Sequence, residues 1–289
     1  MEVHLLVTED SSDASELLAS DTGISKAKIK QAMQKGAVWI SGNRKTERLR
    51  RSKKLLHSGD ELHLYYNEDV LKKEVPMPTL ISDNNGYSIW YKPYGVLSQG
   101  SKWGDHCTID RMVEIHTQKR AYLVHRLDRA TTGLMIIAHS KDTAAKLSKL
   151  FRDRAIDKRY LAVVAGEFPD TADIQTIKSI IDGKKAISHM SKLGYCPRLQ
   201  QSLVDIKIET GRKHQIRRQL SESGHPIIGD RLYGQTENNG NHTDNLQLCC
   251  YSLAFRCPTS GADKHYELDT MFRPALPVNV NQNLPNKIR

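Results

Sequence analysis

The order of apolar segments limits the folds open to this chain. Runs typical of strands and patterns typical of amphipathic helices are interspersed over residues 80–289, without the regular strand–helix–strand spacing of a parallel sheet. No stretch approaches the roughly 20 consecutive apolar residues that a membrane-spanning helix needs, so no membrane partner is expected. This order predicts an α+β fold. Strands are expected at residues 88–91, 122–124, 133–138, 160–165 and 204–208, and helices after Ser140 and before Gly224.

The first 67 residues form a separate, basic unit. The net charge of the chain is +10, and residues 22–58 alone hold eleven Lys or Arg against one Glu. Such a localised excess favours a docking surface for nucleic acid, with a merely solvated surface as the alternative. Within it, residues 25–35 predict a basic helix capped by Ser25 and stopped by Gly36, followed by strands at 38–40 and 61–66.

A segment with mixed charge and little periodicity follows this unit. Residues 68–79 contain Pro76 and Pro78 and are interpreted as a linker between residues 1–67 and a larger domain at 80–289. One polypeptide with one candidate site suggests a monomer.

The cysteines and the missing motifs limit the metal sites, disulfides and cofactors that this chain is expected to have. The five cysteines include no C-x-x-C pair, and the N-terminus lacks a basic start followed by an apolar core, so free thiols in the cytoplasm are expected. Phosphate-loop, dinucleotide-binding, zinc-protease and nucleophile-elbow motifs are all missing. An enzyme with this sequence is expected to use side chains alone, without a metal or a cofactor.

Three polar segments are candidates for chemistry. Asp128 stands in a loop between two apolar runs, beside Arg126 and Arg129, and an ionised carboxylate held there could act as nucleophile or base. A carboxylate that caps a turn is the alternative. Residues 210–218 place basic side chains at a helix start, which suits a phosphate. Tyr160 opens a strand behind two basic residues and could equally be a core aromatic.

Taken together, these segments resemble the RluA-type family of pseudouridine synthases over residues 80–275. The N-terminal unit is similar, more loosely, to the S4-type RNA-binding domain that many members carry. The matching segments follow in the order Lys92-Pro93-Tyr94-Gly95, His125-Arg126-Leu127-Asp128, Lys158-Arg159-Tyr160-Leu161, Gly211-Arg212-Lys213-His214-Gln215-Ile216-Arg217, and Gly224 to Asp230 with Tyr233-Gly234.

The resemblance implies a fold and a mechanism. The catalytic domain would be a mixed, mainly antiparallel sheet with a central cleft, and the target uridine would be flipped out of the RNA. Asp128 would be the essential catalytic residue and Arg126 would fill the vacated space. Tyr160 would stack on the base and help remove the C5 proton. Arg217 would pair with Asp128, and Ile216 would pack against the base. Other RNA contacts are predicted at Arg212, His214, Lys26, Lys28, Lys30, Arg50 and Arg51.

The substrate and the alternatives follow from the same resemblance. Ribosomal RNA of the large subunit is the preferred substrate, because S4-like modules are common among ribosomal members, and transfer RNA stays open. The second hypothesis is a non-catalytic RNA-binding or ribosome-assembly protein on this fold. Ser98-Gln99-Gly100 and Cys249-Cys250 depart from the residues usual in the family.

Overall fold

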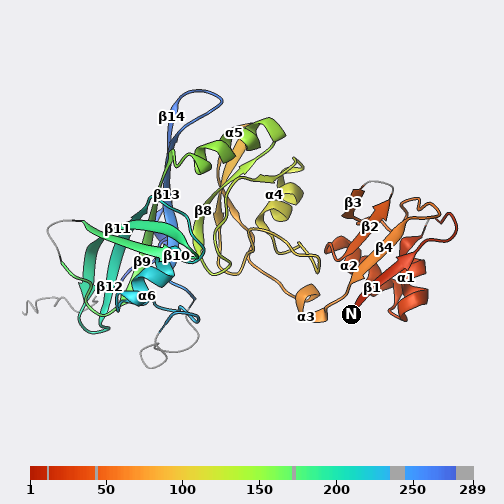
Figure 1. The fold of residues 1–289 in the computed structure, drawn as a ribbon, viewed down its shortest axis with the longest axis horizontal. Coiled ribbons are helices and arrows are strands. Elements are labelled where there is room, and N and C mark those ends of the chain that lie inside the picture. The colour runs from red at the N-terminus through yellow and green to blue at the C-terminus, as the bar shows by residue number, and fades with distance from the viewer. Residues whose placement is uncertain (12, 43–44, 171–173, 235–244, 278–289) are drawn as a thin grey trace, which may run out of the picture.

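A computed structural model describes residues 1–11, 13–42, 45–170, 174–234 and 245–277. Its strands form a four-stranded sheet near the N-terminus and a ten-stranded sheet that contains the rest (Figure 1). Asn43 and Arg44 of the basic segment lie outside the described residues. None of the described helices is long and apolar enough to cross a membrane.

The N-terminal sheet has two helices on one face. The strand order is β1-β4-β2-β3, and buried Ile29 and Met33 of α2 share a core with Leu62 and Leu64 of β4. The hydroxyl of Ser25 caps α2 by accepting from the N–H of Lys28, as predicted. The elements are β1 (Glu2–Leu6), α1 (Ala14–Thr22), α2 (Lys26–Gln34), β2 (Val38–Gly42), β3 (Lys45–Arg48) and β4 (Glu61–Tyr65).

The predicted linker contains a short helix that the sequence pattern did not indicate. Helix α3 (Glu68–Leu71) is capped by Asn67, whose side chain accepts from the N–H of Val70. The segment then continues without regular structure to β5 (Thr79–Asp83). One turn of helix is too short to show a 3.6-residue apolar period, which is why the sequence pattern gave no sign of it.

The larger domain confirms the α+β class. Its sheet has the order β10-β11-β12-β9-β13-β8-β6-β5, with β7 added to β8 and β14 to β13. Among the described strands β13 and β8 pair in parallel, and the other pairs are antiparallel. The strands are β6 (Tyr87–Lys92), β7 (Tyr122–Leu123), β8 (Thr132–Ala138), β9 (Ile156–Ala165), β10 (Gln175–Ile181), β11 (Lys184–Cys196), β12 (Gln201–Ile208), β13 (Leu248–Arg256) and β14 (Asp263–Glu267).

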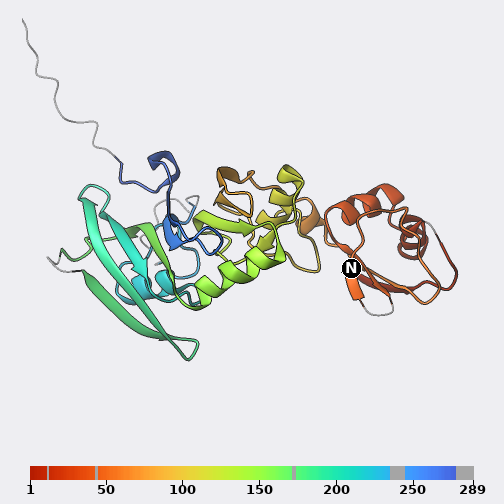
Figure 2. The same cartoon turned by 90° about the horizontal axis from the view of Figure 1, so that it is seen from above.

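Three helices flank this sheet. Helix α5 (Lys141–Arg152) begins at Ser140, as predicted, and lies against β7 and β8. Helix α6 (Gln215–Glu222) lies against β10 at the opposite end of the sheet. Seen from above, the N-terminal module and the β10–β11 hairpin occupy opposite ends of the molecule (Figure 2). Helix α4 (Ile109–Thr117) and the 3-10 helix η1 (Thr270–Phe272) complete the domain.

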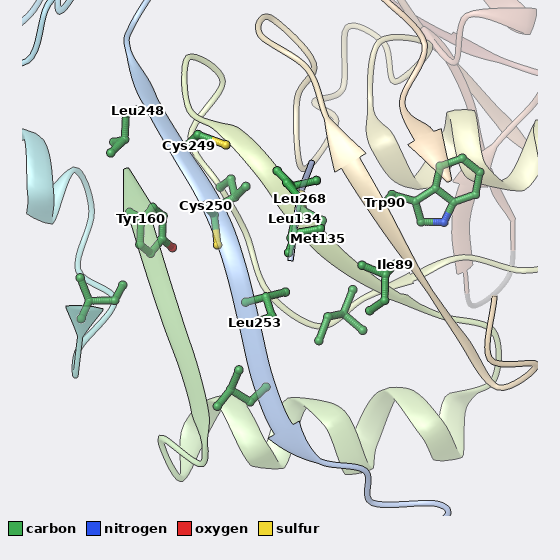
Figure 3. Packing of buried hydrophobic residues seen from close by; sticks show 14 of the residues in the cluster. Ile89, Trp90, Leu134, Met135, Tyr160, Leu248, Cys249, Cys250, Leu253 and Leu268 are labelled. Atoms are coloured by element: carbon green, nitrogen blue, oxygen red, sulfur yellow. The ribbon is translucent and has the colours of Figure 1, made fainter. Parts of the chain in front are cut away.

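The centre of the large sheet is tightly packed. Figure 3 shows Cys250 of β13 between Tyr160 of β9 and Leu134 of β8. Where β13 crosses β8, a Cβ on Gly133 would lie 2.3 Å from the carbonyl oxygen of Cys250, and the φ of Gly133 is +122°. Only glycine allows this close approach of β8 to β13.

The N-terminal module contacts one loop of the larger domain, residues 97–107. The carboxylate of Asp105 binds both Arg48, with Nε at 3.0 Å, and Arg50. The indole N–H of Trp39 donates to the carbonyl of Lys102 at 3.1 Å. These contacts join the basic module to a loop that also reaches the cleft described below.

Candidate active site

A cavity of about 830 Å³ opens beside the loop that carries Asp128. A smaller cavity of about 90 Å³ shares part of its wall. Both are lined by Arg126, Asp128, Tyr160 and Arg212, which come from three segments distant in the sequence. The fold therefore brings together the residues that the sequence analysis selected in separate motifs.

The carboxylate of Asp128 points into this cavity without a hydrogen bond from any described residue. The turn around it is closed by the backbone, because the N–H of Thr131 donates to the carbonyl of Asp128 at 3.1 Å. The side chain is 31% exposed, and its nearest basic groups are the guanidinium of Arg217, with Nη1 3.8 Å from Oδ2, and the imidazole of His214, with Nε2 also 3.8 Å from Oδ2. A turn-capping role is thus not what the structure shows. The carboxylate is free to contact a ligand.

Arg217 is held chiefly by a different carboxylate, one that the sequence analysis did not assign. Its Nε and Nη2 donate to the two oxygens of Asp230, both at 2.7 Å, and both side chains are buried. Burial raises the pKa of Asp230, but the hydrogen bonds and charge of Arg217, together with the backbone N–H groups of Leu232 and Tyr233, outweigh it and the pKa is lowered. The predicted pairing of Arg217 with Asp128 exists only at the longer 3.8 Å. Asp230 ends the segment Gly224 to Asp230, the last motif of the family resemblance. Its place in that motif was the sequence signal for a role at the site.

His214 is oriented by a second residue of that last motif. Its Nδ1 lies 2.9 Å from the hydroxyl of Tyr233, which leaves Nε2 facing Asp128. Burial lowers the pKa of His214, while the charge of Asp128 acts in the opposite direction. With φ of +55°, His214 stands just before α6 in a left-handed conformation. Its imidazole therefore belongs to the environment of the Asp128 carboxylate.

Tyr160 is both a core aromatic and a wall of the cavity. The side chain is 7% exposed, it packs in the central core, and it lines both cavities. Burial raises the pKa of its phenol well above the usual value, so the neutral form is favoured. Ile216, only 5% exposed, lines the smaller cavity from α6.

Two buried polar side chains donate hydrogen bonds to the backbone of the loop that carries Asp128. Lys92 is fully buried, and its Nζ donates to the carbonyls of Val96 at 3.0 Å and Arg129 at 3.4 Å. Burial lowers its pKa to about 7, although the charge of Asp128 opposes this shift. The hydroxyl of Ser98 bonds to both backbone groups of Leu127. The sequence analysis assigned no role to either side chain.

The rim of the larger cavity is strongly basic. Arg126 is exposed on it, and Arg212 is anchored by a hydrogen bond from Nε to the carbonyl of Lys185 at 3.1 Å. His125 is neutral, because its Nε2 accepts from the N–H of Ile136 and burial lowers its pKa to about 3. Further basic side chains on the rim are Arg129, Arg152, Arg154, Lys158 and Lys213.

The basic residues of the N-terminal module that are predicted to contact RNA fall into two groups, those already paired within the protein and those exposed without a described carboxylate partner. Lys26 pairs with Glu16 at 2.9 Å, and Lys28 pairs with Glu68 at 3.1 Å. Arg50 is occupied by Asp105 and by the carbonyl of Gln34. Lys30 and Arg51 are exposed and have no carboxylate within 4.0 Å among the residues described. These two are the side chains most available to a phosphate.

Comparison with known proteins decides the family. The family described as RNA pseudouridylate synthase matches residues 86–222. An RNA pseudouridine synthase of Bacillus subtilis, called YjbO and itself uncharacterised, is 31% identical over 207 residues, which cover 64% of this chain and 72% of that protein. The chain belongs to the RNA pseudouridine synthase family.

Other members of this family differ in the RNA named for them. A protein of Yersinia pestis called tRNA pseudouridine synthase C is 35% identical over 51% of this chain and 67% of its own length. The ribosomal large subunit pseudouridine synthase D of Pseudomonas aeruginosa is 29% identical over 68% of each chain. The structure of human RNA pseudouridylate synthase domain containing 1 shares the fold, with a TM-score of 0.58 and 21% identity over 68% of this chain and 85% of its own.

Family membership settles the reaction class. RNA pseudouridine synthases are isomerases that convert uridine in RNA to pseudouridine and need no cofactor. Homologues of this chain are named for ribosomal RNA and for transfer RNA.

Proposed function

We propose that this pseudouridine synthase modifies large-subunit ribosomal RNA and that Asp128 is its catalytic carboxylate. The observation that carries the assignment is the free carboxylate of Asp128 in a cavity of about 830 Å³ with a basic rim. A carboxylate to which no described residue donates a hydrogen bond is available to contact the substrate. The volume suits a flipped nucleotide, since ligand pockets span roughly 300–1,000 Å³.

The other residues act around that carboxylate in our proposal. Arg217, fixed by Asp230, and His214 place positive or polar groups beside the side chain of Asp128. Tyr160 and Ile216 form the apolar wall on which the extruded uracil stacks. Because the raised pKa of Tyr160 makes a phenolate costly, we assign it stacking rather than removal of the C5 proton.

Flipping a base leaves a gap in the RNA stack, at a cost of a few kcal/mol. Arg126 is exposed on the cavity rim, two residues before Asp128, and it is the side chain that we assign to this gap. Arg212 and the remaining rim cations would hold the flanking phosphates, so that affinity falls with salt.

We also propose that residues 1–67 act as an S4-like RNA-binding module. The support is the exposed basic surface of α2, together with Arg51, on a unit that has its own core. Docking through Asp105 holds this unit beside the domain that contains the cleft, which favours a large structured RNA. The five cysteines are buried and free, which supports a cytoplasmic enzyme, and we keep the monomer as a prediction.

Release of tritium from C5-labelled uridine tests this proposal. Unmodified ribosomal and transfer RNA would be assayed separately with the wild type, Asp128→Asn and the exposed control Asp153→Asn. We expect release from large-subunit ribosomal RNA with the wild type and the control, and none with Asp128→Asn. Release from transfer RNA alone would overturn the substrate assignment but keep the role of Asp128.

Retained release with Asp128→Asn would overturn the catalytic assignment. If the wild type released no tritium from either RNA but bound both, a binding role on the same fold would replace catalysis. Binding is measured by filter retention at two salt concentrations.

A further inference from the structure

A cluster of metal-binding side chains lies on the N-terminal sheet, on the face that the helices do not cover. His4 of β1 and His63 of β4 are directly opposite in the antiparallel register, and Glu61 precedes His63 by two residues. Residues two apart on a strand share a face, so the three side chains project together. Their ligand atoms all lie within 4.8 Å of one another.

The two imidazoles face each other through the same type of nitrogen. Nδ1 of His4 lies 2.7 Å from Nδ1 of His63. The other nitrogen of His4, Nε2, is 3.4 Å from a carboxylate oxygen of Glu2, which can only accept a hydrogen bond. Nε2 therefore carries the hydrogen, and the lone pair of His4 is on Nδ1, toward His63.

The second imidazole is oriented from the neighbouring strand. Nε2 of His63 lies 2.7 Å from the hydroxyl of Ser41 on β2, and that hydroxyl lies 2.8 Å from the hydroxyl of Thr46 on β3. Without a metal, Nδ1 of His63 donates to Nδ1 of His4, and Nε2 of His63 accepts from Ser41. A metal at Nδ1 would displace this hydrogen to Nε2; Ser41 would then accept from Nε2 and donate to Thr46, and the lone pair of His63 would also be on Nδ1. Such hydrogen bonds from the distal nitrogen fix ring orientation in metal sites.

We propose that His4, His63 and Glu61 bind one Zn²⁺ or a similar divalent transition metal. Two imidazole nitrogens, one carboxylate oxygen and a water complete the tetrahedral set that Zn²⁺ prefers. Imidazole ligands favour Zn²⁺, Ni²⁺ or Cu²⁺ over Mg²⁺ and Ca²⁺. His63 is 12% exposed while the side chains of His4 and Glu61 are 45% and 46% exposed, so the cluster opens to solvent on one side.

A bound metal would fasten the N-terminal strand. Strand β1 is at the edge of the sheet and pairs with β4. A metal coordinated by His4 and by His63 would add a bond between these two strands. The sequence analysis expected no metal, and 59 residues separate the two histidines, so no sequence spacing could show this cluster.

Titration of the full-length, tag-free protein with ZnCl₂ by calorimetry tests the site. We expect one equivalent to bind, and we expect His4→Ala or His63→Ala to weaken binding at least about ten-fold. His57→Ala, which removes an exposed histidine of the same module outside the cluster, should leave the affinity unchanged. Circular dichroism verifies that each variant is folded.

Cobalt gives an independent readout. Co²⁺ should give absorption bands typical of tetrahedral coordination in the wild type and in His57→Ala, but not in His63→Ala. Absence of saturable binding would mean that His4 and His63 only form a hydrogen bond with each other, and it would overturn the proposal. Binding that His63→Ala leaves unchanged would assign the metal elsewhere and overturn it as well.

Discussion

The hydroxyl of Ser98 makes two hydrogen bonds with the backbone of Leu127, the residue that precedes Asp128. It donates to the carbonyl at 2.6 Å and accepts from the N–H at 3.0 Å, and Ser98 is buried. The loop that holds Asp128 is thus supported by a buried side chain that lies 29 residues before Leu127 in the chain.

Replacing Ser98 should therefore impair catalysis and stability together. In Ser98→Ala, two buried backbone groups of Leu127 lose their partner, which costs about 1–3 kcal/mol. We expect a lower kcat with little change in KM, since this hydroxyl is engaged with both backbone groups of Leu127. Ser98→Thr keeps the hydroxyl and should restore much of kcat; equal kcat in Ser98→Ala and wild type would refute the supporting role.

The buried Arg217–Asp230 pair should be required for folding as well as for the site. Asp230→Asn removes the charge that compensates Arg217, and breaking a buried ion pair from one side costs roughly 3–5 kcal/mol. Chemical denaturation measures the loss. The double variant Arg217→Met with Asp230→Leu should be more stable than Asp230→Asn alone, because no buried charge is left unpaired. A double variant less stable than the single one would contradict this explanation.

Gly133 should tolerate no side chain. Its Cβ would lie 2.4 Å from the backbone nitrogen of Cys250, which cannot move without separating β8 from β13. Gly183 also has a positive φ, +73°, but has nothing within 4 Å. We expect Gly183→Ala to cost about 1 kcal/mol of unfolding free energy and Gly133→Ala clearly more. Similar urea midpoints for the two variants would rule out the close approach.

Acid should destabilise the protein through His125. The folded-state pKa is about 3, far below the unfolded value near 6.5, because burial disfavours the charged ring. The unfolded state then binds more protons, so stability is full above pH 6.5 and falls as the pH drops toward 3, by about 1.4 kcal/mol per unit. His125→Gln should show a shallower fall between pH 6 and 4 in urea titrations. An unchanged slope would mean that other groups cause the acid sensitivity.

Docking of the N-terminal module should affect binding rather than chemistry. Asp105→Ala removes the partner of both Arg48 and Arg50, and we expect faster proteolysis within residues 68–79. KM for full-length RNA should rise several-fold while kcat on a short stem-loop stays constant. Lys119→Ala, which breaks an exposed pair with Asp83 within the larger domain, is the matched control and should change neither. Protease resistance equal to the wild type would refute the docking role.

The sequence by itself determined the family, the α+β class and the segments that form the cleft. This was possible because Asp128, Tyr160 and Arg217 each stand in a compact local motif. Local signals also located α2 and α5, through the capping hydroxyls of Ser25 and Ser140. Such capping interactions join residues only a few positions apart, so they can be predicted from the sequence.

Only the tertiary structure decided which side chains face one another across those segments. It assigned Asp230 to Arg217, Ser98 to Leu127 and Asp105 to the basic module, contacts that join residues 13 to 57 positions apart. The pairing of His4 with His63 depends on strand register in the same way. Register and sheet order result from packing of the whole core, and no local pattern of the sequence specifies them.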